Sequence, residues 1–178
     1  MNTAMHENQR VAVFVDNQNI YYSAKNLYNS LIDFGAVLKH ALGKRKLIRA
    51  FSYVIKADVG AEKEFFNALS KIGFEVKSKD LQVFYGGNKK GDWDVGLCMD
   101  VVRMIPKIDV CVLVSGDGDY SELVEYAKSQ GVRVEVIAFQ KTSSSKLLEI
   151  ADYFYDLSSD TKKFLIKKWI WSYLNFYL

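Results

Sequence analysis

The stretch Val110-Cys-Val-Leu-Val-Ser-Gly-Asp-Gly-Asp-Tyr120 joins an unbroken apolar run to an abrupt polar turn. Residues 110–114 have the composition of a strand that is buried on both faces, as strands of parallel sheets are. We expect the two glycines of the turn to provide backbone angles that other residues avoid. Asp117 and Asp119 then follow the carboxyl end of a central strand, where open α/β sheets bind their ligands.

The two aspartates of this turn have two alternative roles. Carboxylates this close repel each other, and both stay ionised only where water, a cation or hydrogen-bond donors offset the repulsion. This favours a site for a divalent metal ion. Alternatively, one of them serves only as the N-cap of the helix that begins near Ser121, because aspartate is a good capping residue.

A second apolar run, at residues 11–15, ends in the same way. It is followed at once by Asp16-Asn17-Gln18-Asn19 and then by a segment with helical character at residues 20–31. Asp16 or Asn17 could cap that helix, but capping alone does not explain four acid or amide residues in succession.

Strands and helices alternate along the chain. We expect strands at residues 11–15, 46–55, 74–78, 110–114, 132–139 and 153–157, an edge strand at 81–85, and helices at 20–31, 34–42, 60–72, 95–105, 121–130 and 146–152. This order predicts an α/β fold, a three-layer α/β/α sandwich with a mainly parallel central sheet. Right-handed crossovers would bring Asp16, Asp117 and Asp119 to one edge of the sheet, and Asp94 could add a fourth carboxylate.

Composition sets limits on the function. The chain has 178 residues, 49% of them hydrophobic and 25% charged, and a net charge of +3 that is too small to indicate nucleic-acid binding by itself. Cys98 and Cys111 lie in apolar patterns and are expected to be reduced core residues. Neither a signal peptide nor an apolar run of roughly 20 residues is present, so we expect a cytoplasmic protein without a membrane span.

The segment after the α/β pattern differs from the rest. We expect one domain at residues 1–158 and an aromatic, lysine-rich helix at 159–178, whose last 18 residues hold four lysines and no acid. This helix could pack on the domain, which we favour, form a homodimer through its exposed aromatic side chains, or contact nucleic acid. A role at a membrane surface is a weaker alternative.

Carboxylates without a histidine or cysteine ligand set suit a hard cation. Mg²⁺ and Mn²⁺ prefer oxygen ligands, and the usual chemistry of such a site is phosphate-ester hydrolysis. Lys89 and Lys90 could steer a polyanion toward it. Asp100 lies inside an apolar helix, where Arg103 is its local partner, and a paired structural role is the simpler reading of it.

Four motifs in order resemble the NYN domain, and more closely the LabA-like branch of the PIN-like nuclease superfamily. They are Val-Phe-Val-Asp16-Asn17-Gln-Asn19, then Lys90-Gly91-x-x-Asp94-Val95 with Asp100, then Val-Ser115-Gly116-Asp117-Gly-Asp119-Tyr120, and a serine loop before Leu147 and Ala151-Asp152. The resemblance covers residues 10–158. It departs from the family pattern at Asp92-Trp93, which adds a charge and a bulky ring, and it does not extend to the tail.

The resemblance implies a PIN-like sandwich with a Mg²⁺- or Mn²⁺-dependent ribonuclease site. The residues that match as metal-binding and catalytic acids are Asp16, Asp94, Asp117 and Asp119, and Asp100 matches a recurrent acid near the site. The residues expected to support the site or bind RNA substrate are Asn17, Asn19, Lys90, Ser115 and Ser143.

Three functions remain open on the sequence. The first is a metal-dependent endoribonuclease. The second is a non-catalytic RNA-binding or regulatory protein that keeps the nuclease fold, because function depends on the site and not on the fold. The third, a phosphatase with an aspartyl nucleophile, ranks low because Gln18 stands where such enzymes need an acid.

Overall fold

A six-stranded parallel sheet forms the centre of the protein. The structure is a computed structural model that describes residues 6–56, 62–80, 82–83, 89–90 and 92–166. The strands are, in sheet order, β4 (Glu75–Asp80), β3 (Lys46–Lys56), β1 (Arg10–Asp16), β7 (Val110–Val114), β8 (Arg133–Ala138) and β9 (Tyr153–Asp156). All neighbouring pairs run parallel, so the predicted α/β sandwich is confirmed.

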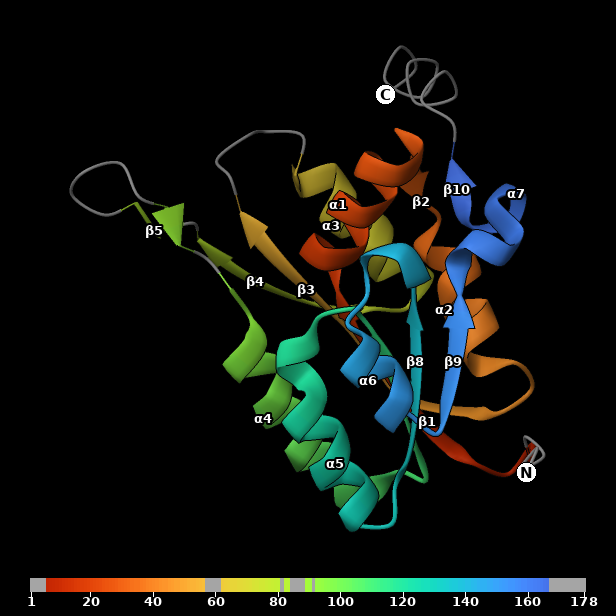
Figure 1. The fold of residues 1–178 in the computed structure, drawn as a ribbon. Coiled ribbons are helices and arrows are strands. Elements are labelled where there is room, and N and C mark those ends of the chain that lie inside the picture. The colour runs from red at the N-terminus through yellow and green to blue at the C-terminus, as the bar shows by residue number, and fades with distance from the viewer. Residues whose placement is uncertain (1–5, 57–61, 81, 84–88, 91, 167–178) are drawn as a thin grey trace.

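Helices cover both faces of this sheet (Figure 1). One group consists of α1 (Asn17–Tyr28), α2 (Phe34–Leu42) and α3 (Glu62–Ile72), and the other of α4 (Asp94–Met104), α5 (Ser121–Ser129) and α6 (Ser145–Ile150). In the described segments, 3₁₀ turns lie at Ile105–Lys107, Gly118–Tyr120, Gln140–Thr142 and Leu157–Asp160. Within the described residues, no helix is both long and apolar enough to cross a membrane.

The order of the strands reverses between β1 and β7. From β1 the chain moves outward through β3 to β4, and then it returns to the other side of β1 to form β7, β8 and β9. Val15 pairs with Val114, so the residues that follow them, Asp16 and Ser115, emerge side by side. Ligands of open α/β sheets bind at such a switch point, outside the carboxyl ends of the strands.

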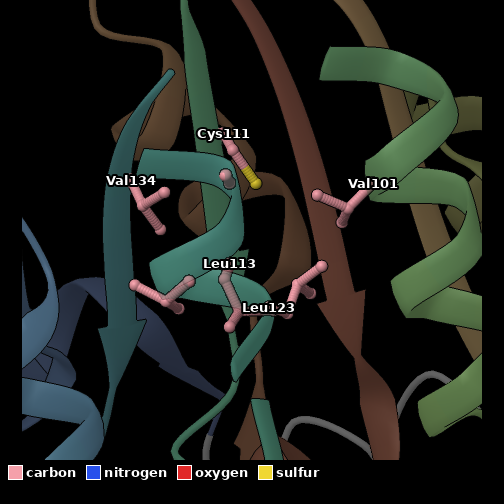
Figure 2. A pocket seen from close by; sticks show the side chains of 7 residues that line it. Val101, Cys111, Leu113, Leu123 and Val134 are labelled. Atoms are coloured by element: carbon pink, nitrogen blue, oxygen red, sulfur yellow. The ribbon is translucent and has the colours of Figure 1, made fainter. Parts of the chain in front are cut away.

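The interior beneath this edge is tightly packed and apolar. Figure 2 shows Cys111 and Leu113 of β7 beside Val134 of the neighbouring strand β8, with Val101 of α4 and Leu123 of α5 packed near them. The hollow between them is too small to hold a water molecule. Burial raises the pKa of the Cys111 thiol to about 12, and both cysteines are free, as expected for reduced core residues.

Two short elements near α1 differ from the sequence prediction. The helix expected up to residue 31 ends at Tyr28, because Asn29 adopts a left-handed conformation with φ of 48°. After it, β2 (Leu31–Ile32) pairs antiparallel with β10 (Leu165–Ile166). The tail was expected to form one helix from residue 159. In its described part, helix α7 (Thr161–Phe164) is only four residues long, and Leu165–Ile166 form the strand β10.

The remainder of the expected C-terminal helix, residues 167–178, lies outside the described residues. Its role in a homodimer and the domain boundary at residue 158 stay predictions. The expected edge strand at 81–85 is described only as β5 (Gln82–Val83). This strand pairs antiparallel with β6 (Lys89–Lys90) in a separate two-stranded sheet.

Candidate functional site

Asp16 and Ser115 connect the ends of the two central strands. The Ser115 hydroxyl donates a hydrogen bond to Asp16 Oδ2 over 3.3 Å and accepts one from the Asp117 backbone N–H over 3.2 Å. Ser115 has no exposed surface. It therefore holds the two aspartates in position and does not itself face a substrate.

Asn19 provides a second connection between these strand ends. Asp16 caps α1 by accepting a hydrogen bond from the Asn19 backbone N–H over 3.1 Å. The Asn19 side-chain oxygen in turn accepts one from the Gly116 backbone N–H over 2.9 Å. The first turn of α1 is thereby fixed to the turn that carries Asp117.

Tyr120 lies between two carboxylates. Its hydroxyl oxygen is 3.1 Å from Asp94 Oδ1 and 3.3 Å from Asp16 Oδ2, and the residue is 1% exposed. A phenol carries one proton, so it donates to one of these carboxylates at a time. Because Asp94 begins α4 and Asp16 ends β1, this hydroxyl joins both sides of the site.

The two aspartates of the turn after β7 have different surroundings. Asp117 caps the 3₁₀ turn by accepting a hydrogen bond from the Asp119 backbone N–H over 3.0 Å. Helix α5 itself begins after Tyr120 without a side-chain cap, so neither aspartate caps that helix as expected. Asp117 also lines the cleft described below, whereas the Asp119 side chain is exposed and lies outside its lining. One aspartate can thus be both a cap and a site residue.

The two glycines of this turn are required for a reason other than the expected one. Their φ angles are not positive; among the glycines that the structure describes, those with positive φ are Gly43, Gly73 and Gly131. A Cβ atom on Gly116 would lie 2.3 Å from Ser143 Oγ, and one on Gly118 would lie 2.8 Å from Ser144 Oγ. The turn therefore needs glycine because the serine loop packs directly against it.

Asp16 and Asp94 lie among other acids of the site. Burial raises the pKa of Asp16, and the nearby charge of Asp94 adds to the effect. Burial also raises the pKa of Asp94, with contributions from Asp92, Asp117 and Asp119. Among the described residues, no lysine or arginine forms a salt bridge with Asp16, Asp94 or Asp117.

The donor set fits a hard divalent cation. Asp16, Asp94 and Asp117 offer oxygen ligands and excess negative charge at one place. In the part of the chain that the structure describes, no three acidic, histidine or cysteine side chains converge closely enough to enclose a metal ion. Mg²⁺ is commonly held by one or two carboxylates, with water and substrate phosphates as its other ligands, so such an incomplete set still suits it.

An open cleft of about 420 Å³ lies next to these acids. We call it the carboxylate cleft. Its lining consists of Asp16, Gln18, Asn19, Tyr22, Ser23, Asn26, Tyr53, Asp92, Trp93, Asp94, Asp117 and Thr142. Volumes of roughly 300–1,000 Å³ are typical of pockets for small ligands.

Asp100 lies outside this lining and has its own partners. Its carboxylate accepts hydrogen bonds from the Tyr53 hydroxyl over 2.9 Å, from Lys77 over 2.5 Å and from Arg103 over 3.3 Å. Burial alone would raise the pKa of Asp100, but the bonds from Lys77 and Tyr53 hold it below its ordinary value. This arrangement favours the paired structural role over that of a metal ligand.

Two residues expected to bind substrate, Asn17 and Ser143, lie outside the cleft lining. Asn17 is buried and its side-chain amide contacts Ser52 Oγ. The Ser143 hydroxyl donates to the Phe139 carbonyl oxygen over 2.8 Å. Neither residue lines the cleft. Lys90 lies in β6, and its side chain is outside the description.

Several cleft residues were not identified from the sequence as site residues. Gln18, Tyr22 and Asn26 are four residues apart, so they share one face of α1, and this spacing was the available signal. Tyr120 gave no signal beyond its place after Asp119. The contribution of Thr142 depends on how the loop folds, which the sequence pattern does not reveal.

Comparison with known proteins agrees with this architecture. The sequence pattern of the NYN domain matches residues 10–159. The chain is 26% identical over 166 residues to the "Low amplitude and bright protein LabA" of Synechococcus elongatus, covering 89% of this chain and 88% of that protein. It superposes with a TM-score of 0.82 on a crystal structure of a protein of unknown function from Vibrio parahaemolyticus, at 32% identity, covering 92% of this chain and 100% of the other.

Proposed function

This chain belongs to the NYN domain family and is LabA-like, as predicted, and on that premise we propose that it is a metal-dependent endoribonuclease. The family supplies a nuclease-type fold. The observation that carries the proposal is that Asp16, Asp94 and Asp117 line one cleft and that no cation of the described chain forms a salt bridge with them. Unneutralised acids at this edge of the sheet suit a metal ion and a phosphodiester substrate.

Asp16, Asp94 and Asp117 would hold Mg²⁺ or Mn²⁺, with Asp119 available from the adjacent turn. Such an ion activates water and stabilises negative charge on phosphate oxygens. Ser115 and Asn19 fix the directions of the Asp16 and Asp117 carboxylates through the hydrogen bonds described above.

Tyr120 has a separate task in this proposal. Burial raises the pKa of its hydroxyl, and the charges of Asp16 and Asp94 raise it further, so the phenol stays protonated. Its single proton can then be shared between Asp16 and Asp94, which holds the two carboxylates at a fixed separation.

The alternative is an RNA-binding or regulatory protein without catalytic activity. It is favoured by the finding that the described acids do not by themselves enclose a metal ion. An aspartyl phosphatase stays the weakest candidate, because the uncharged Gln18 lines the cleft where that chemistry needs an acid.

An RNA cleavage assay tests the proposal. Labelled single-stranded and hairpin RNAs are incubated with Mn²⁺, Mg²⁺ or EDTA, using the native protein, Asp117→Asn and Glu125→Gln. Asparagine keeps the cap at residue 117, and Glu125 is an exposed acid of α5 outside the cleft.

We expect metal-dependent cleavage by the native protein and by Glu125→Gln, and loss of it in Asp117→Asn. RNA binding without cleavage by any folded variant would favour the alternative. Cleavage that Asp117→Asn leaves intact would place the chemistry elsewhere.

A further inference from the structure

We propose that residues 167–178, the C-terminal tail of the chain, fold back onto helix α3 and cover an apolar surface there. This surface, which we call the α3 stripe, consists of Phe65, Ala68 and Ile72. The inference goes beyond the proposed function and does not depend on it, because the α3 stripe lies outside the lining of the carboxylate cleft.

The α3 stripe is an exposed apolar face of an amphipathic helix. Its three residues follow one another at intervals of three and four, so they lie along one side of α3. Phe65 is 39% and Ile72 is 40% exposed, and Ala68 between them is exposed as well, whereas Leu69 is buried in the core. Phe65 and Ile72 carry no polar group that water could satisfy, unlike an exposed tyrosine.

The first turn of α2 borders the α3 stripe. The ring centroids of Phe34 and Phe65 are 6.0 Å apart. A Cβ atom on Gly35 would lie 4.0 Å from Cγ1 of Ile72, so the start of α2 lies against the end of α3. The stripe therefore continues the apolar surface at the start of α2.

Strand β10 brings the tail to this part of the molecule. It lies beside β2, where Ile166 pairs with Leu31 (Figure 1). Leu31 precedes Phe34 by only three residues, so the described chain ends within about 17 Å of the first turn of α2. The hydrogen bond from the Asp33 N–H to the Phe164 carbonyl oxygen fixes this starting point.

The tail is long enough to cover the α3 stripe from this starting point. Residues 167–178 would span up to about 40 Å when extended and about 18 Å as a helix. Along α3, the distance from Phe65 to Ile72 is about 10 Å. The tail can therefore cross the first turn of α2 and still lie along the stripe.

The composition of the tail suits an apolar surface. Every residue of 167–178 is aromatic or aliphatic except Lys167, Lys168, Ser172 and Asn175. Exposed apolar side chains at this density are costly in water. Packing against the α3 stripe would remove apolar surface of both partners from water, and the two lysines at the start of the tail would keep their charges outside.

A second copy of the chain fits the α3 stripe less well. Stable protein interfaces bury about 800 Å² on each partner. Three side chains that are already more than half covered, as Phe65 and Ile72 are, expose much less than this. The tail is joined to the domain, so its effective concentration at the stripe is in the millimolar range, roughly, which favours it over a free copy.

Tryptophan emission from the tail tests the inference in the full-length protein. The chain has three tryptophans, so Trp93→Phe leaves Trp169 and Trp171 as the reporters. Emission maximum and quenching by acrylamide are measured in this parent protein, with its molar mass in solution determined at each concentration used.

Two changes to the α3 stripe are compared with one control. Phe65→Ser/Ile72→Ser removes apolar surface, and Ala68→Glu adds a charge without removing any packing. The control is Met99→Ser/Tyr126→Ser, because these side chains of α4 and α5 are 45% and 46% exposed. Thermal unfolding identifies the variants that are folded, and Ala68→Glu provides the test if the double change prevents folding.

We expect shielded tail tryptophans in a monomeric parent protein. Both changes to the α3 stripe should shift the emission to the red and strengthen acrylamide quenching, and the control should do neither. Single-stranded RNA should leave the parent emission unchanged, because the aromatic side chains of the tail lie against α3.

Four results would overturn the inference. Tail tryptophans that are fully exposed in the parent would show that the tail is not docked. Unchanged emission in folded stripe variants, or an equal shift in the control, would show that it docks elsewhere. Shielding that is lost on dilution together with a dimer would assign the stripe to a second copy, and quenching by RNA would assign the aromatic side chains to nucleic acid.

Discussion

The hydroxyl oxygen of Tyr120 lies 3.1 Å from Oδ1 of Asp94, and it is the only described side chain that contacts both Asp94 and Asp16 through hydrogen bonds. Tyr120→Phe removes this hydroxyl and keeps the buried ring. We expect Mn²⁺ affinity to fall by about tenfold, the low end for loss of a partner that orients metal ligands. Titration calorimetry with Mn²⁺ measures this.

Tyr126→Phe is the control for that measurement. Tyr126 is 46% exposed on α5 and does not line the carboxylate cleft. The Tyr126→Phe protein should bind Mn²⁺ with the same affinity as the native protein. Equal affinities in all three proteins would mean that the Tyr120 hydroxyl does not orient the acids.

Asp94→Asn should stabilise the metal-free protein at neutral pH. The folded-state pKa of Asp94 is raised by burial and by neighbouring acids, so its proton binds more tightly in the folded than in the unfolded state. This tighter proton binding stabilises the folded native protein below the pKa of about 4 that Asp94 has in the unfolded state. The stabilisation is lost as the pH rises through the pKa of Asp94 in the folded state. In EDTA at pH 7 the variant should have a higher unfolding free energy than the native protein.

Thermal unfolding from about pH 4 to pH 8 tests this, because the two proteins should converge at the acidic end. Asp109→Asn is a control of opposite sign. Hydrogen bonds from Arg10 lower the pKa of Asp109, so its contribution to stability is present at neutral pH and is lost as the pH falls. A native protein as stable as Asp94→Asn at neutral pH would contradict the prediction.

Glu135→Ala should be strongly destabilising. The Arg45 and Glu135 side chains are 1% and 3% exposed, and they form two hydrogen bonds, of 2.9 Å and 2.8 Å. Without Glu135 the Arg45 guanidinium is a buried charge without its counter-ion, a change that costs about 3–5 kcal/mol. Urea unfolding should show this loss.

The pair between Arg49 and Glu75 serves as its comparison. It has the same chemistry, but its side chains are 44% and 46% exposed. Glu75→Ala should therefore change the unfolding free energy by less than about 1 kcal/mol. Similar losses of unfolding free energy in Glu135→Ala and Glu75→Ala would show that burial of the ion pair is not the cause of the destabilisation.

Gly118→Ala should be destabilising and should be rescued by a second change. The added Cβ atom would lie 2.8 Å from Ser144 Oγ and 2.9 Å from Ser144 Cβ, and these are side-chain atoms only. Overpacking of this kind costs about 1–3 kcal/mol. Ser144→Gly removes both atoms, and glycine is tolerated at an N-cap.

Gly116→Ala provides the contrast in a double-mutant cycle. There the added atom would also lie 3.0 Å from Ser143 Cα, which is backbone. Ser143→Gly should therefore restore less of the stability lost in Gly116→Ala. Equal rescue at both positions, measured by thermal unfolding, would contradict the close packing described here.

Patterns local to the sequence predicted the sheet and its acidic edge. The apolar runs at residues 11–15 and 110–114 became the two central strands, and Asp16 and Asp117 follow their ends as expected. Capping preferences indicated only that one of Asp117 and Asp119 is a cap; in the structure Asp117 has this role, for the 3₁₀ turn and not for the helix.

Features that depend on contacts distant in sequence were missed. The glycine turn is explained by the serine loop that packs against it, and this contact is visible only in the fold. Tyr120 meets Asp16 across 104 residues of chain. Asp119 was grouped with Asp117, but the 3₁₀ turn leaves its side chain exposed.

The pairing of β10 with β2 bears on where this protein can be shortened. Phe164 is completely buried, packs against His40 and Tyr155, and its carbonyl accepts a hydrogen bond from the Asp33 backbone N–H over 2.9 Å. A chain that is cut at residue 159, where the family match ends, would lack Phe164 and these contacts. The segment that matches the family therefore ends before the segment that packs as one folded unit.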